Sequence, residues 1–122
     1  MKIKKRNRKF KVGRKKNIIL KDVGSIKLND NENITFIDTN LREYDVCKKN
    51  WGYYATPSLN KRVKKYGYIA GLVYNKKFKT FFIHLVDTRK KKIFKSYLKK
   101  ENMKLICWLN SKNLERIKVS FK

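Results

Sequence analysis

The sequence predicts an α+β fold in which two helices lie on one face of a mainly antiparallel sheet, in the order βββ-α-ββ-α-β. Three observations lead to this prediction. Short apolar segments are separated by turn residues, two other segments have apolar residues at helical spacing, and the expected strands occur in pairs. A chain of 122 residues with 41% hydrophobic residues can bury one core of this kind.

The N-terminal segment is expected to be a disordered basic arm. It is mostly Lys and Arg, with Ile3, Phe10 and Val12 as its only apolar side chains after the first residue. Self-repulsion and the low apolar content oppose a packed element. The predicted organisation is an arm over residues 1–17, a single domain over residues 18–110, and a short C-terminal helix or tail over residues 111–122.

The first part of the domain is predicted to be a three-stranded meander. Residues 26–28 alternate apolar and polar side chains, residues 29–33 are rich in turn formers, and residues 34–38 look extended. This pattern predicts a β-hairpin. Residues 39–42 supply a second turn, and residues 43–47 then read as a half-buried strand.

A helix is predicted over residues 57–66. Thr56 fits the N-cap, and Pro57 fits the first helical position, where its missing N–H costs nothing. Apolar residues then recur at i, i+4 and i+7 on one face, and Gly67 fits the C-terminal cap.

A second and more buried hairpin is predicted next. Residues 68–74 and 78–86 are apolar runs rich in β-branched and aromatic side chains, and residues 75–77 form the turn between them.

The C-terminal part is predicted to begin with a helix that Asp87 or Thr88 caps and that ends near Asn102. Its apolar stripe consists of Ile93, Phe94, Tyr97 and Leu98. A last strand is expected over residues 105–109, and Leu114 with Ile117 suggests a terminal helix or a loosely docked tail.

The charge of the chain indicates an anionic partner. There are 34 Lys and Arg against 9 Asp and Glu, which leaves a formal net charge of +25. Such a surface favours a polyanion, and we expect RNA first among these. Because 27 of the basic residues are Lys, and Asn and Ile are also abundant, a coding bias toward A/T-rich codons is an alternative source of the lysines. That bias does not explain the scarcity of acidic residues.

The predicted mode of binding is phosphate neutralisation with weak base specificity, through the arm and the Lys-rich helices. The residues predicted to bind nucleic acid are Lys4, Lys5, Arg6, Arg8, Lys9, Arg14, Lys15, Lys16, Lys61, Arg62, Lys64 and Lys65.

A second hypothesis is an accessory or binding protein for an anionic sugar or a protein complex, in which the charge is largely compositional. The free N–H groups at a helix start can seat one anion. Stacking on the aromatic residues nearby, beside the basic run at residues 61–65, would suit single-stranded RNA instead. The alternative for these aromatic residues is to cover a sheet edge. The residues of this candidate ligand site are Trp51, Tyr53, Tyr54, Thr56, Ser58 and Asn60.

Other classes of function have little support in the sequence. His84 is the only histidine and the two cysteines are far apart, so no metal and no cofactor are expected. A nucleophilic pair of Cys47 and His84 is weaker than a structural role for both, and an enzyme is not favoured. No apolar run is long enough to span a bilayer and no secretory signal is visible, so a cytoplasmic protein is expected.

The stretch Trp51-Gly52-Tyr53-Tyr54-Ala55-Thr56-Pro57-Ser58-Leu59-Asn60-Lys61-Arg62, with the later Cys107-Trp108-Leu109, resembles a small bacterial family. The resemblance covers about residues 24–110 and leaves the basic arm outside. It therefore implies that the arm is an addition to a shared domain. It implies no activity and no site residues.

Overall fold

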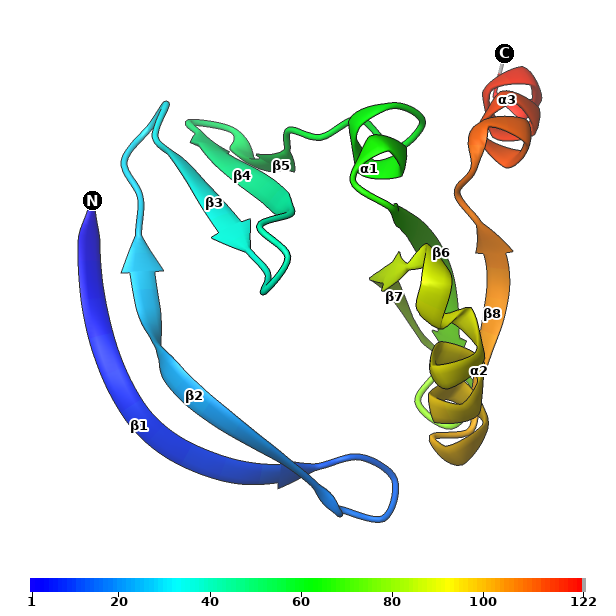
Figure 1. Cartoon of the computed structure of the whole chain (residues 1–122), viewed down its shortest axis with the longest axis horizontal. Coiled ribbons are helices and arrows are strands. Elements are labelled where there is room, and N and C mark those ends of the chain that lie inside the picture. Colours follow the sequence, from blue (N-terminus) through cyan, green and yellow to red (C-terminus); the bar gives the residue numbers. More distant parts are fainter. Residues whose placement is uncertain (122) are drawn as a thin grey trace. The chain divides into compact units, whose positions relative to one another are not determined.

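The computed structural model describes residues 1–121 and divides the chain into two units, unit 1 (Met1–Thr56) and unit 2 (Pro57–Lys122). Every strand pairing in the described residues is antiparallel, and helices accompany the sheets, which confirms the α+β class (Figure 1). The predicted order and the number of helices are wrong, because five strands precede the first helix and a helix follows the last strand.

Unit 1 begins with a two-stranded antiparallel sheet, which we call the ribbon. It consists of β1 (Lys2–Val12) and β2 (Ile18–Lys27), and Figure 1 shows both strands curving together along their length. A β-bulge between Lys5 and Arg8 interrupts the pairing. Two residues of one strand there oppose one of the other, which bends and twists such a pair.

The ribbon corrects the prediction of a disordered arm. The pairing places Phe10 opposite Leu20 and Val12 opposite Ile18, so apolar side chains that are sparse along β1 meet apolar partners across the ladder. The boundary predicted after residue 17 falls at the start of β2, and the chain divides after Thr56 instead.

The second sheet of unit 1 has the order β3-β4-β5, from β3 (Asn33–Ile37), β4 (Glu43–Lys49) and β5 (Gly52–Ala55). The predicted hairpin between residues 26–28 and 34–38 is wrong, because β2 pairs with β1 and β3 pairs with β4.

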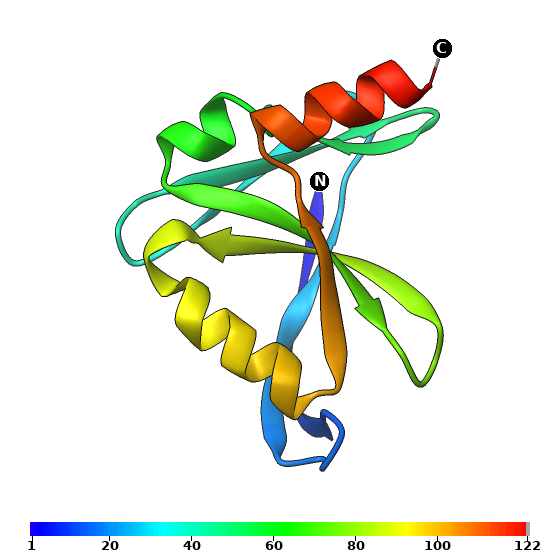
Figure 2. The same cartoon turned by 90° about the vertical axis from the view of Figure 1, so that its right-hand side faces the viewer.

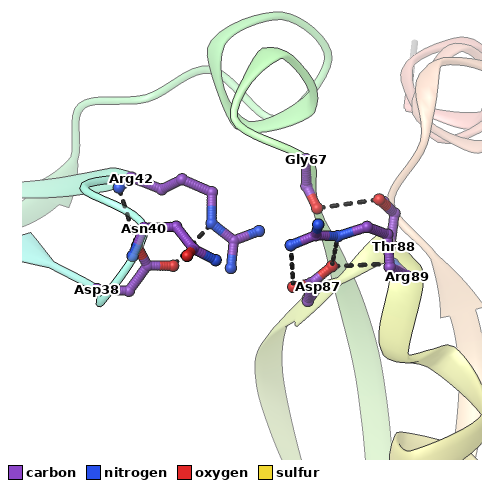
Figure 3. A network of polar contacts seen from close by, with 7 residues as sticks. All are labelled: Asp38, Asn40, Arg42, Gly67, Asp87, Thr88 and Arg89. Carbon is purple, nitrogen blue, oxygen red and sulfur yellow. Dashed lines mark hydrogen bonds and ion pairs between the residues drawn. The ribbon is translucent and has the colours of Figure 1, made fainter.

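The turn over residues 39–42 is confirmed. The Asp38 carboxylate accepts hydrogen bonds from the backbone N–H groups of Asn40 and Arg42, and its other oxygen lies 2.7 Å from Arg42 Nε (Figure 3). This network closes the connection from β3 to β4.

Unit 2 contains a three-stranded sheet of order β7-β6-β8, from β6 (Tyr68–Asn75), β7 (Thr80–Asp87) and β8 (Met103–Trp108). The predicted second hairpin and last strand are confirmed. The helices are α1 (Arg62–Lys65), α2 (Lys91–Lys100) and α3 (Ser111–Ser120), and Figure 2 shows α2 running along this sheet. The buried hydrophobic core residues of this unit are Val63, Ala70, Val73, Val86 and Leu98.

The start of the predicted helix over residues 57–66 is wrong. Only α1 is helical there, and Thr56 does not cap it. The Thr56 backbone N–H donates to the Asp45 carbonyl oxygen, and its hydroxyl donates to the Asp45 carboxylate. Thr56 therefore binds to β4 just beyond the end of β5. The Ser58 hydroxyl instead accepts from the Arg62 backbone N–H at 3.2 Å.

The second predicted helix has the expected start and end. Asp87 Oδ1 accepts from the Arg89 backbone N–H at 2.9 Å, which caps a 3-10 turn (Thr88–Lys90) that leads into α2 (Figure 3). Asn102, just beyond α2, has φ of +55°, as befits a residue that ends a helix.

The C-terminal segment predicted as a helix or a tail is helical over α3, which the side chain of Asn110 caps. Lys122, the last residue of that segment, lies outside the described residues.

Candidate nucleic-acid interface

The ribbon has two chemically different faces. In an antiparallel pair, residues directly opposite one another project to the same side, and alternate residues of each strand share that side. The pairing therefore puts Ile3 with Ile26 and Phe10 with Leu20 on one face, and Lys9 with Lys21 on the other.

We call the second side the lysine face. It carries six lysines, Lys2, Lys4, Lys9, Lys11, Lys21 and Lys27, with Ile19, Val23 and Ser25 as its other members. All six lysines are exposed. Ile19 and Val23, at 63% and 67% exposure, show that this side of β2 faces solvent.

Two pairs of like charge stand directly opposite each other on the lysine face. These are Lys2 with Lys27 and Lys9 with Lys21. Opposed residues in such a ladder lie about 5 Å apart at Cβ, and like charges there destabilise the pair. An anion placed over each pair would remove that repulsion.

The opposite side, the apolar face, holds the only carboxylate of residues 1–27, Asp22. Arg6 Nε lies 2.9 Å and Arg8 Nη2 3.1 Å from its Oδ2 oxygen. The hydrogen bond from Arg6 and that from the Gly24 backbone N–H lower the pKa of Asp22 below its ordinary value. The Asp22 carboxylate therefore pairs with Arg6 and Arg8 at the bulge and not with the lysines of the other face. The guanidinium of Arg8 also lies 5.5 Å from the ring centre of Phe10.

The lysine face consequently keeps its charge uncompensated. In the described part of the chain, no carboxylate oxygen forms an ion pair with any of its six lysines. The face therefore carries two uncompensated groups of lysines, one on each side of the bulge, namely Lys2, Lys4 and Lys27, and Lys9, Lys11 and Lys21.

The arm residues that the sequence predicts to bind nucleic acid fall on different parts of the ribbon. Lys4 and Lys9 lie on the lysine face, whereas Lys5 and Arg8 lie on the apolar face. Arg6 is in the bulge, where it also donates to the Ser25 hydroxyl at 3.3 Å. The remaining three, Arg14, Lys15 and Lys16, are in the connection between the strands.

Four residues of the lysine face were missed by the sequence prediction, namely Lys2, Lys11, Lys21 and Lys27. The sequence feature that could have identified them is the alternation along residues 18–23. Ile18, Leu20 and Asp22 alternate there with Ile19, Lys21 and Val23, as expected for a strand whose two faces differ. Without the pairing register, that strand could not be matched to the arm.

The predicted basic helix contributes less than expected. Lys61, Lys64 and Lys65 are exposed, but Arg62 is half-buried. Because α1 is a single turn, the predicted anion seat at Ser58 and Asn60 lacks the helix dipole on which it was based. These residues belong to unit 2, while the arm residues belong to unit 1.

The predicted aromatic residues lie on both faces of the β4–β5 hairpin, because the neighbouring residues Tyr53 and Tyr54 of β5 project to opposite sides. Trp51, Tyr53 and Tyr54 are 68%, 64% and 42% exposed. The Trp51 and Tyr54 rings stack with centres 5.9 Å apart, and Lys48 Nζ lies 5.7 Å from the centre of the Tyr53 ring. The three side chains stay exposed, so they do not cover a sheet edge. The ammonium group of Lys48 beside Tyr53 also pairs with Asp30 at 3.0 Å.

His84 lies on β7 against aromatic side chains of α2. Its ring centre is 5.5 Å from that of Phe94 and 6.3 Å from that of Tyr97. Burial lowers its pKa, and its Nδ1 atom is buried with no hydrogen-bond partner within residues 1–121. The surroundings are those of a neutral structural histidine. Cys47, the other member of the hypothetical pair, is buried in β4 of unit 1.

Residues 1–121 contain no group of three or more His, Cys, Asp or Glu side chains placed to hold a metal ion. No helix among these residues is both long and apolar enough to cross a membrane.

Comparison with protein-family models, curated proteins and solved structures finds no match to this chain. The resemblance of Trp51–Arg62 to a small bacterial family therefore stays a prediction.

Proposed function

We propose that this protein is a small, non-enzymatic nucleic-acid-binding protein that neutralises the phosphates of RNA or DNA. The observation that supports this function is the lysine face of the ribbon, where six exposed ammonium groups share one side of two paired strands. Net charge alone could be compositional. The segregation of these lysines from Asp22 concentrates charge on a single surface.

Binding by this face should depend steeply on salt, because each neutralised phosphate releases condensed counterions. For six contacts, the slope of log affinity against log salt is about −4 on single strands and about −5 on duplex DNA. Affinity for a duplex should then fall about 10³-fold between 50 and 200 mM salt.

The test compares two variants of equal charge. In the lysine-face variant, all six lysines of the lysine face are replaced by Gln. In the control variant, six exposed lysines of unit 2 are replaced by Gln, namely Lys76, Lys92, Lys95, Lys99, Lys104 and Lys112. Fluorescence anisotropy with labelled RNA and DNA 20-mers, at several salt concentrations, gives the affinity and the slope.

We expect the lysine-face variant to lose most of the salt slope and the control variant to retain most of it. Equal losses in both variants would show that only total charge matters, and affinity independent of salt would refute the proposal.

The aromatic cluster of Trp51, Tyr53 and Tyr54 favours a second candidate, the binding of an anionic sugar. The stacked Trp51 and Tyr54 rings supply one exposed stacking face. Tyr53, on the other face of the hairpin, lies beside the ammonium group of Lys48, which also pairs with Asp30. Titration with a uronic-acid oligosaccharide, followed by tryptophan fluorescence, tests this. Binding that Tyr54→Ala abolishes, and that the lysine-face variant retains, would support the sugar over the nucleic acid.

A further inference from the structure

We infer that the ribbon binds duplex DNA, with its lysine face in the major groove and without sequence preference. This inference rests on the proposed function and deepens it by naming the form of nucleic acid. It draws on the dimensions of the ribbon, the chemistry of the lysine face and the geometry at Gly24.

The dimensions of the ribbon suit the groove of B-form DNA. β1 has 11 residues and β2 has 10. At about 3.4 Å per residue the ribbon is about 35 Å long, close to one helical turn of DNA. The major groove of B-DNA, about 12 Å wide, admits a two-stranded β-ribbon. The major groove of A-form RNA is deep and narrow, and does not.

The chemistry of the lysine face favours a duplex over a single strand. Proteins that hold single strands stack bases on aromatic side chains. The lysine face has no aromatic residue, and Phe10, the only aromatic residue of the ribbon, lies on the apolar face. A duplex offers one phosphate per about 1.7 Å of axis, so it can supply phosphates to both groups of lysines without any stacking.

The same residues predict that bases are not read. Discrimination in the major groove uses pairs from Arg or Lys to guanine and from Asn or Gln to adenine, and only the planar guanidinium of Arg holds the guanine pair in a fixed bidentate geometry. The lysine face contains neither Arg, Asn nor Gln, and Lys lacks a planar fork. Its lysines therefore act as point charges on the phosphates that line the groove.

A substitution at Gly24 tests the shape of the ribbon without changing its charge. Its φ is +148°, and a Cβ atom added there would collide with the carbonyl oxygen of Lys4 on the neighbouring strand. Gly24→Ala should therefore disrupt the pairing at the bulge while every charge stays in place. Gly52→Ala, outside the ribbon in β5, is the matched control, because φ there is also positive, at +142°, but an added Cβ atom meets no atom within 4 Å.

The experiment measures the affinity of the full-length protein for three labelled 20-mers of one sequence: duplex DNA, single-stranded DNA and duplex RNA. We expect duplex DNA to bind at least tenfold more tightly than either of the others, with the same affinity for a shuffled duplex sequence. Gly24→Ala should remove that preference, and Gly52→Ala should keep it. Methyl green, which occupies the major groove, should compete, and netropsin, which fills the minor groove, should not.

Single-stranded DNA or duplex RNA bound as tightly as duplex DNA would overturn this inference and leave the proposed function standing, provided that binding stays dependent on salt and on the lysine face. A preference for duplex DNA that survives in Gly24→Ala, or competition by netropsin alone, would also overturn it. Failure of all three nucleic acids to bind would overturn the proposed function as well.

Discussion

At the scale of single residues, His84 links the packing of unit 2 to pH. Burial among aromatic rings lowers its pKa, and its buried Nδ1 would have to carry a proton without an acceptor in the described structure. The unfolded chain therefore takes up this proton at a higher pH than the folded chain does. The free energy of unfolding is thus highest above the pKa that His84 has in the unfolded chain, and it falls as the pH drops toward the lower pKa that His84 has in the folded chain.

We predict that unit 2 is less stable at pH 5.5 than at pH 7, and that His84→Gln removes this difference. His84 is the only histidine of the chain, so no other imidazole contributes in that window. Urea unfolding measures the effect through Trp108 fluorescence, in a Trp51→Phe background, because Trp51 and Trp108 are the only tryptophans. An unchanged pH dependence in the His84 variant would assign the effect to another group.

At the scale of elements, the segment at residues 56–62 connects the β4–β5 sheet to α1, and a different hydroxyl group forms a hydrogen bond in each of these two elements. The Thr56 hydroxyl donates to Asp45 in the β4–β5 sheet, and the Ser58 hydroxyl accepts from the first residue of α1. Each such hydrogen bond contributes about 0.5–1.5 kcal/mol.

We predict that Thr56→Ala speeds amide hydrogen exchange in β4 and β5 by up to about tenfold, and leaves the α1 amides unchanged. Ser58→Ala should do the reverse, since it removes the acceptor of the Arg62 N–H. Faster exchange in α1 caused by Thr56→Ala would restore Thr56 to the capping role that the sequence predicts.

At the scale of the whole molecule, the ribbon and the core of unit 2 belong to different units. The buried residues Val63, Val73 and Leu98 all lie beyond residue 56. Deleting residues 1–27 removes both strands of the ribbon together and leaves no unpaired β2.

We predict that this deletion changes the melting temperature of unit 2 by less than about 2 °C. For a unit of this size, that shift corresponds to a change in the free energy of unfolding below about 0.5 kcal/mol. It should abolish nucleic-acid binding. Melting is followed by Trp108 fluorescence in the Trp51→Phe background. A large drop in melting temperature would mean that residues 1–27 stabilise unit 2, and intact binding would place the interface elsewhere.

The amino-acid sequence by itself determined the features that depend on neighbouring residues. Continuous apolar runs marked β6 and β7, turn formers marked the Asp38–Arg42 connection, and Asp87 marked the start of the second helical segment. The excess of basic over acidic residues also needed no structure. Each of these signals is local, because it depends on side chains only a few positions apart.

Only the tertiary structure decided which strands pair and therefore which side chains share a face. β1 looked like a disordered arm because its apolar partners, Leu20 and Ile26, lie in the next strand. In the same way Thr56 looked like a helix cap until its hydrogen bond to Asp45 was known. The physical reason is that a shift of one residue in strand register moves every side chain to the opposite face. The lysine face exists only because of that register.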